Sequence, residues 1–556
     1  SSSTIYGVYL TSCASSILND NRFENVTSTG SVFYSLFLSS SGSSEVKNNY
    51  VKNVNILSTF YGVYLSSSTY CTVDNNYFEN VTVNNSSGYA IYLTGSSYTN
   101  VYRTTMINLS CFNYAYGLYN SSSTDCNIEE NKFFELSGFG TGATGAWGIF
   151  ITGGSNNRLV NNSIAYLRST NYTTSATGLN PFGIQISSGT GIKVYFNSVY
   201  LSGTQINVGT SASTSAAFSI TSTSVNNIDV RNNVFANTLQ GLSGSKAYAI
   251  YLPGSGTLTN STFNYNVYYV GGTQGVLGFY TTDRTTLSAW QSAISQDANS
   301  LNVDPIFNAY NLPAPLPGST IVGKGVSISG ISKDIMGENR SSTAPTPGAY
   351  EKAEDIQGPQ ITFTPLQTTT STSNRTLVVT ITDITGVNIS TNAPRLYYRK
   401  STNTNTYNGN TSTNDGWKYA TPVISGDNYT FTIDYSKLYS NGAVAVGDVI
   451  EYFVIAKDNA TRGNMSVVGG TFATMPTTTN LTSSDFPFNS EYSYGIAQAI
   501  SGTYNVGSGN TYTTLTSAGG LFETMNKGVL TGNVTINITS DLDETGAFEL
   551  NRLPQE

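Results

Sequence analysis

The sequence predicts an all-β protein whose first half is a right-handed parallel β-helix. A short strand-like phrase occurs nine times at spacings of 27 to 35 residues, which suits one supersecondary unit per repeat. Nearly every repeat also carries one asparagine at a fixed place, and no amphipathic helix pattern separates the repeats. Equivalent strands without crossover helices must stack in parallel, so each repeat is predicted to form one rung of a rod.

The recurring phrase has the period-two alternation of a β-strand. Its third and fifth positions are apolar in almost every repeat, so we expect them to face the core. The second position is small and the fourth is usually aromatic, and the same alternation places both on the outer face. The fourth position supplies a predicted outer aromatic strip, the candidate binding surface: Tyr9, Phe37, Tyr64, Tyr92, Tyr119 and Phe150.

The fixed asparagine lies in a second phrase of each repeat. Asparagine tolerates left-handed backbone conformations, and stacked amides can hydrogen-bond from one layer to the next. We therefore predict a structural asparagine ladder at a tight turn between two strands, with Thr104 as its one break. Its members are Asn21, Asn49, Asn76, Asn131, Asn162, Asn197, Asn233 and Asn266.

The repeat pattern stops near residue 270, and the composition changes again twice. A short helix is expected at 286–295, where Thr286 offers an N-cap. Strands that alternate around polar turns, such as 377–381 and 429–433, predict a β-sandwich. The predicted regions are a β-helix of nine rungs over 1–270, its C-terminal cap over 271–357, an immunoglobulin-like or fibronectin-III-like β-sandwich over 358–495, and the N-terminal cap and first strand of a further β-helix over 496–556.

Three stretches resemble known modules. Phrases such as 304–307 and 348–351 resemble the C-terminal segment of many bacterial right-handed β-helix surface proteins. Residues 358–490 resemble immunoglobulin-like or fibronectin-type-III-like modules of large bacterial adhesins, and 498–556 resemble the start of a β-helix in giant repeat proteins of the type IX secretion class. These resemblances imply a piece of a longer chain, exposed outside the cell at a bacterial surface.

The composition of the chain excludes some classes of binding partner. Charged residues make up only 10% of the chain, the net charge is −8, and no basic cluster exists, so nucleic acid is excluded as an expected partner. No apolar run is long enough to span a membrane. Four cysteines show no metal-ligand spacing, and Cys71 and Cys126 fall two rungs apart, so we expect free thiols.

No catalytic site is predicted. The chain has no histidine, the commonest general base, and its acidic residues are scattered along the repeats. The pair Asp229 and Arg231 is interpreted as a surface salt bridge. In the sandwich, three aspartates could converge on calcium, although we favour turn-forming roles and predict no cofactor: Asp383, Asp448 and Asp458.

The sequence therefore predicts a non-enzymatic structural or adhesive segment of a long surface fibre or giant adhesin. Its expected partners are other copies of itself or neighbouring repeats of the same chain, with surface glycans as an alternative. A protein partner is favoured because polar groups that would orient a sugar are not evident beside the strip. Two other functions stay open: a carbohydrate-active enzyme, either a polysaccharide lyase or a glycoside hydrolase, and a carbohydrate-binding module.

Overall fold

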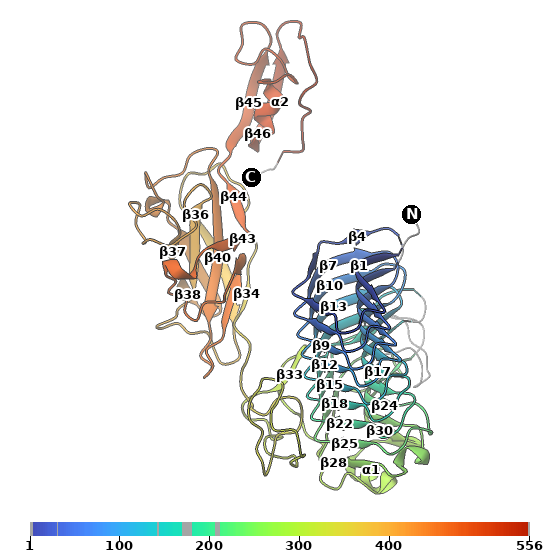
Figure 1. Ribbon diagram of the computed structural model, residues 1–556. Coiled ribbons are helices and arrows are strands. Elements are labelled where there is room, and N and C mark those ends of the chain that lie inside the picture. The colour runs from blue at the N-terminus through green and yellow to red at the C-terminus, as the bar shows by residue number, and fades with distance from the viewer. Residues whose placement is uncertain (1–3, 31, 142–143, 170–180, 206–211, 554–556) are drawn as a thin grey trace. The chain divides into compact units, whose positions relative to one another are not determined.

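The computed structural model describes residues 4–30, 32–141, 144–169, 181–205 and 212–553 (Figure 1). The chain divides into two compact units, Ser1–Glu354 and Asp355–Glu556. Strands dominate both units. The described residues contain two short α-helices and three 3-10 turns, η1 (Ser255–Leu258), η2 (Tyr435–Lys437) and η3 (Ser483–Asp485).

The first unit is a β-solenoid of stacked parallel coils, in which most rungs give one strand to each of three sheets (Figure 1). The first sheet contains β1 (Ile5–Thr11), β5 (Phe33–Ser39), β8 (Phe60–Ser66), β11 (Gly88–Thr94), β14 (Tyr114–Asn120), β17 (Gly145–Ile151), β21 (Pro181–Ile186), β24 (Thr214–Ile220), β27 (Lys246–Leu252), β30 (Gly275–Tyr280) and the antiparallel β31 (Thr282–Arg284). The second contains β2 (Ile17–Asn19), β6 (Glu45–Lys47), β9 (Thr72–Asp74), β12 (Asn100–Tyr102), β15 (Asn127–Glu129), β18 (Arg158–Val160), β22 (Lys193–Tyr195), β25 (Asp229–Arg231) and β28 (Thr262–Asn264). The third contains β3 (Arg22–Glu24), β4 (Thr27–Ser28), β7 (Tyr50–Ile56), β10 (Tyr77–Val83), β13 (Thr105–Cys111), β16 (Lys132–Gly138), β19 (Ser163–Ala165), β20 (Arg168–Ser169), β23 (Ser198–Leu201), β26 (Val234–Asn237) and β29 (Val267–Val270).

The second position of the recurring phrase faces inward, which corrects the predicted alternation. In the ladder between β5 and β8, Tyr34 pairs with Tyr61 and Leu36 with Val63, but the intervening position makes no pair. Ser35 is fully buried there, and a Cβ on Gly62 would come within 2.6 Å of the Phe78 ring. Because the ladder is interrupted at this position, strict period two fails, and only a small side chain fits against the interior ring.

Amides stack along the turn between the second and third sheets at the predicted asparagines. The Nδ2 of Asn131 donates to Asn162 Oδ1 at 3.0 Å and to the carbonyl of Val101 at 3.0 Å. Its own Oδ1 accepts the backbone N–H of Thr104 at 2.9 Å. The rung that has threonine in place of the ladder asparagine is therefore still hydrogen-bonded to Asn131. The left-handed residue of the turn is the one before the ladder asparagine, as at Glu130, rather than the ladder asparagine itself.

The C-terminal end of the solenoid is covered by α1 (Leu287–Ile294), which begins at the N-cap Thr286 and packs against β30. Its buried Trp290 donates to Asp297 Oδ2 at 2.8 Å. Residues 302–354 then run back beside the third sheet rather than over the end, with β32 (Phe307–Ala309) and β33 (Leu312–Pro315) near β19 and β23. Tyr350 anchors this returning segment through a 3.0 Å hydrogen bond to Ser163.

The second unit contains two packed antiparallel sheets followed by a parallel strand pair. One sheet has the order β34 (Gln360–Thr362), β35 (Arg375–Thr382), β39 (Asn428–Ile433) and β38 (Val423–Ser425). The other has β37 (Lys418–Ala420), β36 (Arg395–Lys400), β40 (Val449–Lys457) and β41 (Met465–Val468), with β44 (Ser493–Gly495) beside β40 and the pair β42 (Gly470–Phe472) and β43 (Phe488–Ser490) following. Beyond these sheets, β45 (Gln498–Val506) and β46 (Gly528–Ile538) pair in parallel around α2 (Leu521–Met525).

Replacing Asn131 with Leu should destabilise the solenoid. The side chain is fully buried and makes three hydrogen bonds, so its removal takes away the acceptor of the buried Thr104 N–H and the donors to Asn162 and to the Val101 carbonyl. We expect a loss of about 1–3 kcal/mol in the free energy of unfolding, measured by denaturant titration.

A matched control is Asn127→Leu on the neighbouring strand. That side chain is only partly buried, and its amide donates to Asn100 Oδ1 on the outer face. We expect a change within about 0.5 kcal/mol. Equal losses for the two variants would contradict a special contribution from the buried ladder.

Candidate functional site

The outer surface of the first sheet carries two columns of aromatic rings, not one. The fourth position contributes the predicted strip, and the first position, which also points outward, contributes a second column that the sequence analysis missed. Together they form what we term the aromatic face: Tyr6, Tyr34, Tyr61, Tyr89, Tyr116 and Trp147, with Tyr9, Phe37, Tyr64, Tyr92, Tyr119 and Phe150.

Rings of the aromatic face contact each other in two directions. Between rungs, Tyr61 stacks on Tyr89 with centroids 5.0 Å apart and Tyr64 stacks on Tyr92 at 4.9 Å. Within a rung, Tyr61 and Tyr64 meet edge to face at 5.1 Å and 84°. Both geometries are the favoured ones for ring quadrupoles, so the two columns hold each other rigid.

Exposure changes along the aromatic face. Tyr6 and Tyr9 are 40% and 50% exposed, and the next rungs are half-buried. Tyr116 and Trp147 are buried, and Trp147 donates its indole N–H to Gln185 at 2.7 Å. The open part of the face therefore lies on the first rungs, and the later rings belong to a covered aromatic cluster.

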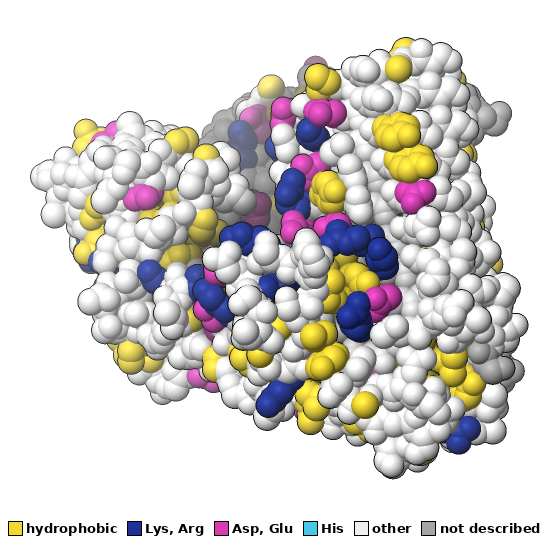
Figure 2. Space-filling model, turned by 60° about the horizontal axis from the view of Figure 1, so that its bottom comes forward, with side chains coloured by type: hydrophobic (Ala, Val, Ile, Leu, Met, Phe, Trp, Pro, Cys, Tyr) yellow, Lys and Arg dark blue, Asp and Glu magenta, His cyan; other side chains and the backbone are white. Residues whose placement is uncertain are grey.

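Two hydroxyls of the aromatic face, those of Tyr34 and Tyr61, stay uncharged at neutral pH. Partial burial, with a smaller contribution from Tyr64, raises the pKa of Tyr34 to about 12, and burial raises the pKa of Tyr61 well above the usual range. An uncharged, rigid, ring-lined surface on a rod is a contact surface of the kind that interfaces use. Figure 2 shows that charged side chains are sparse over much of the visible surface.

Charged side chains of the second sheet and its turns pair between rungs. Arg103 donates to Asp74 at 2.6 Å and lies 3.9 Å from Glu130, and Arg158 pairs with Glu129. Burial raises the pKa of both Glu129 and Glu130 above the usual value for a glutamate, against the lowering effect of the neighbouring arginines.

The pair Asp229 and Arg231 also forms an ion pair, at 2.5 Å. Tyr195 donates its hydroxyl to the same aspartate at 2.7 Å. Neither charged side chain is fully buried, which agrees with the interpretation as a surface salt bridge.

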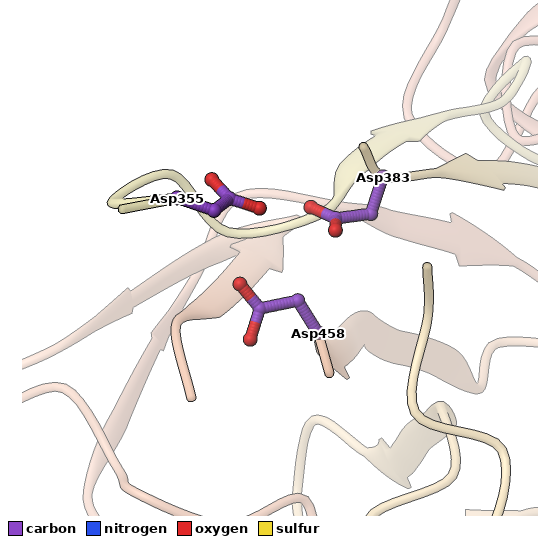
Figure 3. Close-up of side chains that lie close together, drawn as sticks. All are labelled: Asp355, Asp383 and Asp458. Atoms are coloured by element: carbon purple, nitrogen blue, oxygen red, sulfur yellow. The ribbon is translucent and has the colours of Figure 1, made fainter. Parts of the chain in front are cut away.

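Three aspartates meet in the second unit, and they are not the three that the sequence brought together. Asp355, Asp383 and Asp458 have carboxylate oxygens within 4.8 Å of one another (Figure 3). Asp448 lies elsewhere and pairs with Lys400 at 2.8 Å. Asp355 was missed because it precedes the sandwich strands, in a stretch without periodic pattern.

Hydrogen bonds already occupy these carboxylates. The Thr385 backbone N–H donates to Asp383 at 2.8 Å, and the single proton of its hydroxyl is shared between Asp383 at 2.8 Å and Asp355 at 2.9 Å. Asn464 donates to both oxygens of Asp458. Burial, with repulsion from the other two aspartates, raises the pKa of Asp383. The oxygens are of the type that Ca²⁺ takes, and the absence of a cofactor stays a prediction.

The cysteines are free, as expected. Cys71, Cys111 and Cys126 are buried and Cys13 is exposed. Burial raises the pKa of the Cys126 thiol to about 11, which leaves it unreactive at neutral pH. Within the part of the chain that the structure describes, no helix has the length and apolar character needed to cross a membrane.

Comparison with known proteins supports the solenoid. The sequence model of the family described as "Right handed beta helix region" matches residues 6–163, so the solenoid is a right-handed β-helix. No curated protein matches the chain. Among solved structures, a mutant tailspike protein of E. coli bacteriophage HK620 in complex with a pentasaccharide aligns over 82% of this chain and 85% of that chain, at 12% identity and a TM-score of 0.19.

The prediction that the chain is not an enzyme is contradicted by this comparison, which returns a tailspike protein in complex with a pentasaccharide. A likeness of this strength assigns no activity to the chain, but the non-enzymatic prediction is withdrawn. The lack of histidine does not by itself exclude a site that cleaves glycans. Carboxyl groups serve as acid and base in glycoside hydrolysis, and burial raises the pKa of Glu129 and of Glu130 in the direction that such an acid needs.

Replacing Asp383 with Asn should stabilise the second unit at pH 7. The raised pKa means that ionised Asp383 destabilises the fold, so the wild type loses stability as pH rises through that folded-state pKa. Asn keeps the acceptor for Thr385 and removes one repelling charge. We expect a higher Tm for Asp383→Asn at pH 7 and a difference that vanishes below about pH 4, measured by calorimetry without divalent cations.

Calcium provides the control for this prediction. If hydrogen bonds alone satisfy the cluster, millimolar Ca²⁺ should leave the wild-type Tm unchanged. A rise in Tm with Ca²⁺ in the wild type, lost in Asp383→Asn, would instead show that the three carboxylates bind the cation.

Proposed function

We propose that the chain is an extracellular structural and adhesive segment of a long bacterial surface fibre or giant adhesin. The order of a β-helix, a sandwich similar to immunoglobulin or fibronectin-III modules, and a further parallel strand pair supports this proposal. So does the resemblance of the C-terminal region to giant repeat proteins of the type IX secretion class. In this proposal the right-handed β-helix acts as a stiff spacer that presents a contact surface.

The aromatic face carries the proposal. It is uncharged, and its rings are held in place by contacts such as the 5.1 Å stacking of Phe37 on Tyr64. Rings that are already fixed lose little conformational entropy on binding. A second copy of the rod is the partner we propose, because a flat, repetitive surface is complementary to itself and a low charge density allows rods to approach closely.

The triple variant Tyr64→Ser, Tyr92→Ser and Tyr119→Ser should lose self-association. Each ring is replaced by a side chain that offers little apolar area, while the interior residues of these strands are untouched. We expect sedimentation velocity to show concentration-dependent assembly of the wild type and an association constant at least about tenfold lower for the triple variant. The β-rich circular dichroism spectrum should be the same for both proteins.

The matched control is Tyr70→Ser with Tyr98→Ser. These two exposed rings also stack, at 4.8 Å, but they lie in a turn outside the aromatic face. The equivalent turn residues of earlier rungs, Ser15 and Ser43, share the same left-handed backbone, so serine is already compatible there. Unchanged assembly in the triple variant, or equal losses in both variants, would remove the aromatic face as the contact surface.

A carbohydrate-active enzyme is a second candidate, favoured by the raised pKa of Glu129 and Glu130 beside Arg103 and Arg158. If these carboxyls act on a glycan, incubation with a panel of polysaccharides should release reducing ends. Glu130→Gln should then lower the release by about 10²-fold or more, whereas Glu45→Gln, another partly buried carboxylate on the second sheet, should not. No release from any polysaccharide would eliminate this candidate.

A further inference from the structure

A pocket of about 340 Å³ lies where the returning segment meets the third sheet, on the last rungs of the solenoid. The third sheet contributes Tyr200 from β23 and Tyr269 from β29 to its lining, and the returning segment contributes Asp304, Phe307 and Tyr310. The volume is within the range of sites for small molecules. Because the aromatic face belongs to the first sheet, this pocket is a separate feature.

Tyr200 and Tyr269 occupy the same register position of the third sheet, two rungs apart. The residue between them is Ala236, so the column of rings is interrupted there. Equivalent residues two rungs apart are separated by about 9–10 Å, which is too far for ring stacking. The two rings can therefore enclose a group of the size of a methylated ammonium between them.

The rings that line the pocket are tilted against their neighbours rather than stacked face to face. Tyr200 meets Phe307 with centroids 5.1 Å apart and planes at 51°, and Tyr310 meets Tyr166 at 4.4 Å and 61°. None of the four lining rings is fully buried, and Tyr310 is 50% exposed. Tilted rings that remain accessible form the wall of an aromatic cage, the arrangement that attracts organic cations.

One carboxylate gives the pocket its charge. Among the described residues that line it, Asp304 is the only charged one, and this residue is exposed. Its Oδ1 accepts the backbone N–H of Ile306 at 2.8 Å, which fixes the carboxylate beside the rings. Burial and the nearby Asp304 raise the pKa of Tyr269 to about 12, so this hydroxyl stays neutral and the pocket keeps a net negative charge.

Backbone strain occurs at the same place. Ile306 is β-branched and has a φ of 49°, in the left-handed region that such residues rarely adopt. Its side chain is 41% exposed, so the conformation does not serve to bury it. This turn brings Asp304 and Phe307 to one pocket, and strain of this kind is typical of positions that hold a ligand.

We propose that this pocket binds a quaternary ammonium group, held between the rings of Tyr200 and Tyr269 and paired with the carboxylate of Asp304. The charge of such a group is spread over its methyl groups, so the negative faces of aromatic rings attract it. It has no N–H to satisfy, whereas a primary ammonium brings three donors to a pocket that consists mainly of rings. The site is independent of self-association through the aromatic face.

Proton NMR tests the proposal on the full chain with choline and phosphocholine as probes. We expect the N-methyl resonance to move upfield, because protons over ring faces are shielded, and binding to saturate below about 20 mM. The control ligand is the neutral carbon isostere of choline, in which a tert-butyl group replaces the trimethylammonium group. It should bind at least about tenfold more weakly. Phosphocholine binding as tight as that of choline would indicate a headgroup as the source of the ligand, and weaker binding a free solute.

Variants of the pocket test which residues hold the cation. Asp304→Asn keeps the acceptor for the Ile306 N–H and should weaken choline binding about tenfold. Tyr269→Ala should weaken it about tenfold as well, and Tyr269→Phe should keep it within about threefold. Circular dichroism and Tm verify that each variant is folded.

The matched control is Asp20→Asn, which removes an exposed carboxylate from a turn of the first rung. The equivalent residues of the next rungs, Asn48 and Asn75, share its left-handed backbone, so asparagine is compatible there. This variant should bind choline as the wild type does. An unshifted N-methyl resonance for both probes, equal binding of the neutral isostere, or wild-type affinity in Asp304→Asn or Tyr269→Ala would overturn the proposal.

Discussion

The parallel backbone ladder between rungs is the constraint on which the first unit depends. It places equivalent residues of successive rungs directly above one another, about 4.8 Å apart. Any side chain that repeats at one position must therefore contact its own kind. This selects residues whose self-contact is favourable: apolar groups inside, amides at the buried turn, and flat rings outside. Charges do not satisfy the same rule, and the structure accommodates them by alternating sign, as where Arg103 lies between Asp74 and Glu130.

Much of this architecture can be predicted from the sequence because the constraint leaves a periodic trace. The apolar third and fifth positions, the ladder asparagines and the fourth-position rings all lie in register in the structure, as at Tyr64 and Tyr92. The helix after the rungs was also found, since Thr286 and the apolar residues behind it form a local signal. Features that depend on a repeat or on a helix cap can be predicted from the sequence, because residues close by in the chain determine them.

The remainder depends on contacts that leave no local trace. Strict alternation placed Gly62 outside, but the interrupted ladder turns this position toward the Phe78 ring. The path of 302–354 along the third sheet is set by distant contacts such as Tyr350 with Ser163. Asp355 joins Asp383 and Asp458 through folding of the second unit, and Asp448 is drawn away by Lys400. In each case the sequence gives the type of residue, but it does not show which distant residue that side chain contacts.

The outer surface of the first sheet shows how one stacking rule can support different contacts along a single rod. On the early rungs, rings occupy both outward positions, so every ring has ring neighbours on several sides and polar groups have no place. On later rungs the fourth position becomes Gln185 and then Ser219, and the repeat of like on like is broken. The first position is interrupted as well, at Ala216, and Tyr248 beyond it donates its hydroxyl to Asp283. Ring-on-ring contacts and hydrogen bonds from ring hydroxyls thus occupy different rungs of the first sheet, and the same backbone ladder supports both.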